Sequence, residues 1–153
     1  MTPTQTWTPG HNVCTVIWRR NPVNDALEIL VVRSQTTYRG RVTPWRVKFP
    51  GGGQEGPNES VEGTRDREVW QETGLAFRVS KEIWRDDSNP GHIKYGFMAS
   101  YTECYGELRK ERVIDINDEL EPPYWAPVET LGRELFEKHQ PLFMEALRRL
   151  RVL

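Results

Sequence analysis

A strand, a run of three glycines and a helix follow one another between residues 45 and 75, and this order constrains the fold more than any other part of the chain. Trp45–Phe49 alternates large apolar residues with basic ones, which is the period of a β-strand with one buried face. Pro50 and the three glycines then end the strand. Ser60–Thr73 contains no proline, carries acidic residues in its first turn and precedes Gly74, so it predicts a helix that a left-handed glycine ends.

The rest of the sequence predicts strands on both sides of this unit and a helix at the end. The 153 residues are about one domain's worth of chain, and no repeat or linker divides them, so we expect a single domain over 1–153. The order of elements is α+β with a mixed sheet, and not a repeating βαβ pattern. Glu107–Glu121 is ambiguous. Strands are expected at Asn12–Trp18, Leu27–Val32, Phe77–Trp84 and Lys94–Thr102, a short segment at Tyr124–Trp125, and helical spacing over Leu131–Leu150 with an interruption at Pro141.

The overall composition excludes several classes of protein. With 21 basic and 22 acidic residues, the chain does not bind nucleic acid through bulk positive charge. It has no apolar stretch long enough to span a membrane, and residues 1–12 lack the basic-then-apolar layout of a secretory signal, so we expect a cytoplasmic protein. Cys14 and Cys104 stand far apart and outside any metal-binding spacing, which favours two reduced thiols over a disulfide.

The charges are unevenly distributed along the chain. Residues 1–50 hold seven basic and two acidic side chains, a balance of +5, whereas residues 51–75 hold two basic and six acidic ones, a balance of −4. A cationic half beside an anionic segment would suit an anionic substrate on one side and a metal cation on the other. A solvated surface gives the same counts, so the distribution alone does not decide between these readings.

The predicted helix carries two glutamates one turn apart. Glu68 and Glu72 lie on the same helix face, with Gln71 beside them, and like charges at this spacing repel by roughly 0.2–0.5 kcal/mol. A hard divalent cation between the carboxylates would turn this repulsion into a binding site, because Mg²⁺ takes one or two carboxylates together with waters and phosphate oxygens. The alternative is an acidic helix face in water.

The whole array from residue 53 to residue 75 resembles the Nudix box of the Nudix hydrolase family. The spacing is a glycine, five residues, a glutamate, seven residues, Arg-Glu, an apolar residue, a gap, two acids, a gap, a glycine and an apolar residue. Eight of these nine places are kept over 23 consecutive positions, and the exception is Gln71, which stands where the family has the first acid of its pair. The matching residues are Gly53, Glu59, Arg67, Glu68, Val69, Glu72, Gly74 and Leu75.

The resemblance implies an α/β/α sandwich with a mixed β-sheet, a catalytic helix and a C-terminal helix. It also implies Mg²⁺, with Mn²⁺ as a substitute. The metal ligands would be Glu68, Glu72, the carbonyl of Gly52 or of Gly51, and a distal acid before Trp125, for which we choose Glu119 over Glu121. By the same resemblance Arg67 and Glu59 would pair and hold the helix against the loop, with Gly53 and Gln71 in support.

The family resemblance implies hydrolysis of a nucleoside diphosphate linked to another group, with Glu68, Glu72 or Glu119 taking the proton from the attacking water. By analogy with small one-domain members we expect a nucleoside triphosphate to give a monophosphate and pyrophosphate. The candidate substrate-binding residues are Arg41 and Arg46 for phosphates, Tyr95 for stacking on a base, and His139, which lies where related nucleoside triphosphatases contact the base.

Three alternatives stay open at this point. The substrate could instead be ADP-ribose or a dinucleoside polyphosphate. Gln71 would also suit a catalytically impaired module that senses a nucleotide, although Glu68 and Glu72 argue against this. Finally, the acidic helix could belong to an interaction domain without a metal. The expected partner is a small nucleotide, and the expected state is a monomer or a homodimer.

Overall fold

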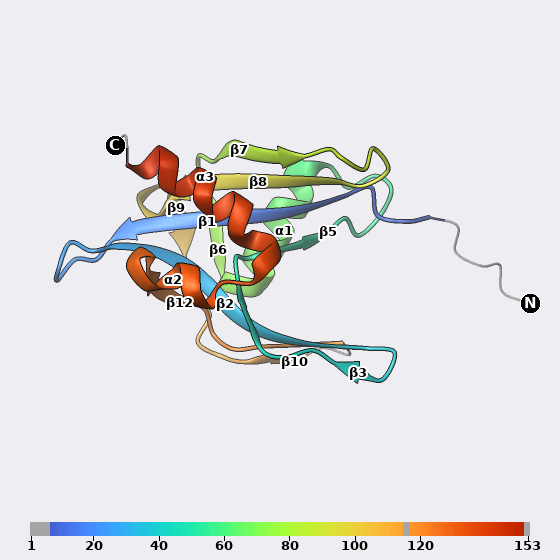
Figure 1. Ribbon diagram of the computed structural model, residues 1–153, viewed down its shortest axis with the longest axis horizontal. Helices are drawn as coiled ribbons and strands as arrows, with labels where there is room; N and C mark the ends of the chain where they lie inside the picture. The colour runs from blue at the N-terminus through green and yellow to red at the C-terminus, as the bar shows by residue number, and fades with distance from the viewer. Residues whose placement is uncertain (1–6, 115–116, 152–153) are drawn as a thin grey trace, which may run out of the picture.

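A curved mixed β-sheet forms the centre of the molecule, with one helix on one face and two on the other (Figure 1). The computed structural model describes residues 7–114 and 117–151. Residues 1–6, on which the prediction about a secretory signal partly rests, lie outside the described residues. Helix α1 (Val61–Thr73) covers one face, and α2 (Val128–Glu134) and α3 (Gln140–Leu150) cover the other. This arrangement confirms the α+β fold with a mixed sheet, a central helix and a C-terminal helix.

The two longest strands organise the sheet. Strand β1 (His11–Arg20) is parallel to β8 (Ile93–Ser100), and β8 is antiparallel to the edge strand β7 (Lys81–Asp86). On its other side β1 pairs with the start of β2 (Leu27–Tyr38). The shorter strands attached to β2, directly or through β11, are β3 (Arg41–Val42), β4 (Arg46–Lys48), β10 (Val113–Ile114), β11 (Asp118–Leu120) and β12 (Tyr124–Pro127). Strands β6 (Leu75–Phe77) and β9 (Cys104–Gly106) form a separate ribbon.

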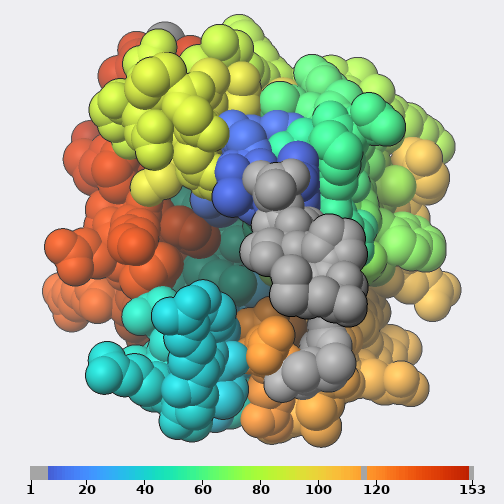
Figure 2. All heavy atoms as spheres, turned by 90° about the vertical axis from the view of Figure 1, so that its right-hand side faces the viewer, coloured from blue at the N-terminus to red at the C-terminus, as the bar shows by residue number. Residues whose placement is uncertain are grey.

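Strands β1 and β2 diverge, and this divergence positions the site. They pair only where Trp18–Arg20 meets Leu27–Ile29. Further along, β4 pairs with β2, while β5 (Gly51–Gly53) pairs with β1, so the β4–β5 connection bridges the two strands. The sheet therefore opens at this end, and the open end is hollow: Figure 2 looks into the hollow, with the teal of the β4–β5 region at its floor.

Two apolar clusters fill the space between the sheet and its helices. The larger one lies under α2 and α3 and the smaller under α1, and each fully buried aliphatic side chain contributes roughly 1.5–3 kcal/mol. Their fully buried members include Val16, Ile29, Val31, Phe49 and Leu131 in the larger cluster and Ile17, Leu30, Val69 and Leu75 in the smaller.

The observed elements differ from the predicted ones where short strands and turns divide the predicted segments. Helix α1 ends at Thr73 as predicted but begins at Val61, one residue later than predicted, because Ser60 is its N-cap. The strand expected at Phe77–Trp84 is the end of β6 and the start of β7. The C-terminal helical stretch divides into α2, the 3₁₀ turn η2 (Glu137–His139) and α3, whose first turn holds Pro141. In the described part of the chain, no helix is both long and apolar enough to cross a membrane.

Candidate active site

Helix α1 is fixed at both ends, and this holds its glutamates in place. The Ser60 side chain accepts the N–H of Gly63 at 2.9 Å, which caps the first turn. At the other end Gly74 has φ of 84°, a left-handed conformation that favours glycine, and its N–H bonds to the carbonyl of Trp70. The guanidinium of Arg109 donates to the carbonyl of Glu72 from Nε at 3.0 Å and from Nη2 at 2.9 Å, so a cation faces the negative end of the helix.

The side chains of Glu68 and Glu72 meet the glycine strand β5. The N–H of Gly51 donates to Oε1 of Glu72 at 3.3 Å. The carboxylate of Glu68 lies against Gly52 so closely that any side chain at this position would collide with it. A side chain at position 52 would therefore displace the Glu68 carboxylate, whereas at position 51 it would collide with the backbone of Val13 and Cys14, so glycine is required at position 51.

The two carboxyl groups influence each other strongly. Glu72 is only 7% exposed, and the pKa of its carboxyl is raised to about 8, chiefly by burial and in part by the charge of Glu68 and by the hydrogen bond that a protonated Glu72 donates to Glu68. The ammonium of Lys48 lowers the same pKa. Without a cation, the buried carboxyl therefore prefers its neutral form. A divalent cation would stabilise the ionised pair, so the donor set fits a hard metal ion.

Arg67 joins the helix to the glycine loop. It donates to Glu59 from Nε at 2.8 Å and from Nη2 at 3.0 Å, to the carbonyl of Gly53 at 2.8 Å, and to Oε1 of Glu68 at 2.9 Å. The Arg67 guanidinium holds the pKa of Glu59 down to about 2. Since Arg67 already bonds the carbonyl of Gly53, the oxygens of Gly51 and Gly52 are the better candidates for a metal.

His11 extends this network, and sequence reasoning missed it. Its Nε2 lies 2.8 Å from Oγ1 of Thr64, and that hydroxyl donates to Oε1 of Glu59. Because the hydroxyl proton points to Glu59, the histidine Nε2 is the donor in the first bond. A histidine in a strand gives no signal when its partner stands 53 positions away.

An open cavity of about 160 Å³, which we name the active-site cavity, lies beside the glycine strand. Ser34 and Thr36 of β2 form one wall, and Arg46 and Lys48 of β4 bring positive charge to it. The guanidinium of Arg46 also lies 4.4 Å from the centre of the Phe136 ring. Among the described residues no carboxylate pairs with either cation within 4 Å. The cavity can therefore take an anionic ligand next to the two glutamates.

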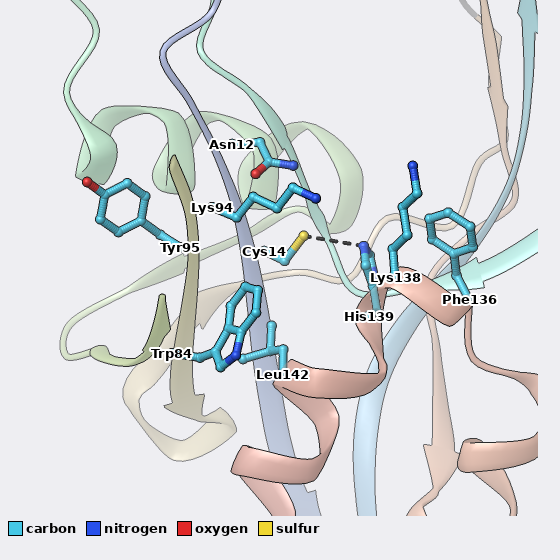
Figure 3. A pocket seen from close by; sticks show the side chains of 9 residues that line it. All are labelled: Asn12, Cys14, Trp84, Lys94, Tyr95, Phe136, Lys138, His139 and Leu142. Carbon is cyan, nitrogen blue, oxygen red and sulfur yellow. Dashed lines mark hydrogen bonds between the residues drawn. The ribbon is translucent and has the colours of Figure 1, made fainter. Parts of the chain in front are cut away.

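His139 borders the active-site cavity but both its ring nitrogens are engaged. Its Nδ1 accepts the N–H of Phe49 at 3.0 Å, and its ring stacks on the Phe49 ring at 5.5 Å. The neutral ring then carries its proton on Nε2, which lies 3.5 Å from Sγ of Cys14 (Figure 3). Burial, together with the charges of Lys48 and Lys94, lowers the pKa of His139 to about 4. It is thus a neutral structural histidine in the cavity wall.

The other candidate residues do not line the active-site cavity. Arg41 is exposed on β3. Tyr95 borders a neighbouring cavity, but its ring is directed away from Cys14 and His139 (Figure 3) and lies under the guanidinium of Arg85. Gln71 is exposed and lies 3.4 Å from Arg67.

Glu119 lies on β11 and forms an ion pair with Arg112. It stands opposite Gln35 in the β11–β2 register, whereas its neighbour Asp118 stands opposite Thr36 of the cavity wall and accepts that hydroxyl at 2.8 Å. The alternate residues of a strand point to opposite faces, so Glu119 and Thr36 face different sides of the sheet. Within residues 7–114 and 117–151 no cluster of three or more acidic, histidine or cysteine side chains gathers around one point.

Comparison with known proteins finds a family that matches this chain and solved structures with a similar fold. A family model described as the NUDIX domain matches residues 10–147. No curated protein matches the sequence. Solved structures with a similar fold include the NUDIX domain of Shewanella oneidensis NrtR in complex with ADP ribose, with 18% identity, a TM-score of 0.64, and coverage of 98% of this chain and 94% of that one.

Two further structures have the same fold. The MutT NUDIX hydrolase of Burkholderia pseudomallei is 19% identical, with a TM-score of 0.63 and coverage of 91% of this chain and 98% of that one. A MutT/nudix family protein of Listeria innocua is 18% identical, with a TM-score of 0.64 and coverage of 95% and 96%. At these identities the likeness shows the fold.

Proposed function

Because the chain belongs to the Nudix family and is a pyrophosphohydrolase by that membership, we propose that it hydrolyses a nucleoside triphosphate to a monophosphate and pyrophosphate. The observation that carries the proposal is the buried carboxyl of Glu72, held by the N–H of Gly51 and next to Glu68. The equally buried Glu28 pairs with Arg19, whereas Glu72 has no ion-pair partner within 4 Å among the described residues. Gly51, which holds Glu72, lines the cavity that contains Arg46 and Lys48. An acidic face exposed to water would leave Glu72 solvated.

We propose Mg²⁺ as the cofactor, with Mn²⁺ as a substitute. Glu68, Glu72 and the carbonyl of Gly51 or Gly52 would hold it, and Gln71 would supply at most a neutral oxygen. When bound, the metal neutralises charge on phosphate oxygens and makes water more acidic. Arg46 and Lys48 would hold the phosphates from the other side of the cavity.

One carboxylate must take the proton of the attacking water. Glu68 and Glu72 already lie at the glycine strand, so they are the first candidates for this base. Glu119 would have to leave its ion pair with Arg112 before it could act. Arg67 and Glu59 act as positioning residues, because Arg67 bonds both the loop carbonyl and the carboxylate of Glu68.

The test is a panel of substrates with the products identified. It includes nucleoside and deoxynucleoside triphosphates, ADP-ribose, nucleotide sugars, dinucleoside polyphosphates and capped RNA, each with Mg²⁺ and without it. We expect a triphosphate to have the highest kcat/KM and to release pyrophosphate only when the metal is present. Release of single phosphates, or equal turnover in EDTA, would contradict the proposal.

ADP-ribose is the second candidate substrate, because a relative with this fold binds it. A sensor would bind the nucleotide saturably without cleaving it, so calorimetry on the same panel separates a sensor from an enzyme. We further propose a cytoplasmic location, since both cysteines are free thiols.

A further inference from the structure

A buried histidine and a buried threonine support the glutamate that pairs with Arg67. His11 of β1 is 8% exposed, and Thr64 of α1 is fully buried. Nε2 of His11 lies 2.8 Å from Oγ1 of Thr64, and this hydroxyl lies 2.5 Å from Oε1 of Glu59. We name His11 and Thr64 the supporting pair. It crosses from β1 to α1, which packs against that strand (Figure 1), and ends at the loop before the helix.

The hydrogen bonds of the supporting pair run in one direction. Glu59 is ionised because it pairs with the guanidinium of Arg67, so its oxygens only accept. The hydroxyl of Thr64 has a single proton, which goes to Glu59, and His11 must therefore donate from Nε2. Moving the Glu59 carboxylate would leave this hydroxyl only the neutral carbonyl of Ser60, at 3.1 Å. Since bonds to a charged acceptor are stronger, the pair favours one position of the carboxylate.

The main chain of Glu59 is held from the same end of β1. The Gln54 side chain accepts the N–H of Gly10 at 2.8 Å and donates to the carbonyl of Glu59 at 3.1 Å. The N–H of Gln54 in turn donates to the carbonyl of His11 at 3.0 Å. Two paths therefore connect the start of β1 to Glu59, one through the supporting pair and one through Gln54.

The position of Glu59 decides how Arg67 divides its charge. Glu59 takes two bonds, from Nε at 2.8 Å and from Nη2 at 3.0 Å, whereas Glu68 takes one, from Nη1 at 2.9 Å. The paired arrangement is the stronger one, so it directs most of the guanidinium to Glu59. The exposed Glu55 adds a carboxylate 3.0 Å from Nε. With Glu59 displaced, more of the charge of Arg67 would turn to Glu68 and compete with a metal ion for the same oxygens.

We propose that His11 and Thr64 are positioning residues for the carboxylate of Glu68, and that they act through Glu59 and Arg67. The inference rests on the proposed function, which gives Glu68 a metal ion to bind. Loss of the supporting pair should weaken metal binding and lower kcat. The KM for the nucleotide at saturating metal should stay near its wild-type value, because the cations of the active-site cavity are unchanged.

The test begins with Thr64→Val, which removes the hydroxyl at nearly constant volume. We expect the Mg²⁺ concentration for half-maximal activity to rise by roughly 10-fold, the lower end of the range for groups that support metal ligands. The Kd for Mn²⁺, measured by calorimetry without substrate, should rise by a similar factor. Thr64→Ser keeps the hydroxyl and should restore most of both quantities. His11→Phe should act in the same direction as Thr64→Val, and His11→Gln, whose amide still donates, should lie between His11→Phe and wild type.

Arg19→Met is the control for a loss of stability alone. It breaks the partly buried ion pair with Glu28, eight residues further along β1 than His11. We expect it to lower the melting temperature without changing the Mg²⁺ requirement or the Kd for Mn²⁺. All assays are run below the melting temperature of every variant. If Thr64→Val does not fold, the two His11 variants make the same comparison.

A folded Thr64→Val with wild-type kcat and wild-type Mn²⁺ affinity would overturn the inference. So would a Thr64→Ser variant as impaired as Thr64→Val, or a loss of metal affinity that Arg19→Met reproduces. If the wild-type protein binds Mn²⁺ but hydrolyses no substrate, the proposed function alone has failed, and the Mn²⁺ titrations still decide the role of the supporting pair. If the wild-type protein binds no Mn²⁺, the metal site and its positioning residues fall together.

Discussion

Glu72 is buried and carries a charge that the proposed chemistry needs. Its substitution should therefore change catalytic activity and stability in opposite directions. We expect Glu72→Gln to lower kcat/KM by at least ~100-fold, because the amide keeps the volume and removes the metal-binding charge. In EDTA at pH 8 the variant should melt at a higher temperature than wild type, since a buried carboxyl with a pKa of about 8 is then partly ionised. Near-wild-type activity would refute the assigned metal site.

Glu62→Gln is the matched control for this variant. It makes the same change on the same helix, at an exposed residue of the first turn. We expect Glu62→Gln to leave both the activity and the metal-free melting temperature near their wild-type values.

Gln71 is the one departure from the Nudix box, and its side chain is exposed to solvent. Its Oε1 is 3.4 Å from the guanidinium of Arg67, which also binds Glu68. We expect Gln71→Glu to preserve or raise kcat/KM, because a carboxylate there adds a ligand and draws part of the Arg67 charge from Glu68. Steady-state kinetics across a Mg²⁺ titration checks this, with Gln71→Met as the comparison. A large loss in Gln71→Glu alone would mean that the amide has its own role.

At the residue scale, sequence reasoning works where spacing along one helix decides the geometry. Glu68 and Glu72 follow from a four-residue interval. By contrast, the face on which Glu119 lies depends on its register with Gln35, which stands 84 positions earlier in the chain. The bond of His11 to Thr64 likewise depends on how a strand meets a helix, and no local pattern records it.

At the scale of elements, the end of α1 depends on a segment that the sequence left ambiguous. Besides its two bonds to the carbonyl of Glu72, Arg109 donates to the carbonyl of Glu121 at 3.0 Å. Its guanidinium therefore ties the helix to the chain beyond β11. We expect Arg109→Met to lower the free energy of unfolding by roughly 1–3 kcal/mol, because the partly buried carbonyls lose a charged donor.

Urea unfolding measures this loss, and Arg109→Lys serves as the comparison because it keeps the charge with fewer donors. We expect Arg109→Lys to fall between wild type and Arg109→Met. An unfolding free energy of Arg109→Met equal to that of wild type would show that the helix end holds without this contact.

The strands around Arg109 show why the sequence was uninformative there. Strands β10 and β11 have two and three residues, too few for a hydrophobic period to appear. Their order comes from pairing with each other and with β2, whose partner residues stand more than 80 positions earlier. The unit of strand, glycine turn and helix could be predicted because its signals are local.

At the scale of the whole molecule, the β4–β5 connection links two titrating groups. It donates the N–H of Phe49 to His139 on one side and the N–H of Gly51 to Glu72 on the other. The folded pKa of His139 is lowered to about 4 and that of Glu72 is raised to about 8. Their contributions to stability therefore change with pH in opposite directions.

The sign of each contribution follows from which state binds more protons. Between about pH 4.5 and 6.5 the unfolded chain protonates His139 and the folded chain does not, so stability rises with pH. His11, whose pKa is also lowered, has the same sign. Over the same range the folded chain keeps the proton of Glu72 and the unfolded chain loses it, so stability falls with pH. Glu59, with a pKa near 2, changes its contribution mainly below this window.

In EDTA we therefore expect the wild-type free energy of unfolding to change less between pH 4.5 and 6.5 than that of either single variant, because the fall from Glu72 opposes the rise from His139 and His11. Glu72→Gln should expose the histidine slope, a rise of up to about 1.4 kcal/mol per pH unit, and His139→Gln should expose a comparable fall that continues towards pH 8. Denaturant unfolding at half-unit pH steps measures all three curves. If both variants give curves parallel to wild type, neither group has the altered pKa that its burial implies. Saturating Mg²⁺ should remove the falling limb of His139→Gln, because a cation that binds only the ionised carboxylates stabilises the folded state most where the metal-free protein is weakest.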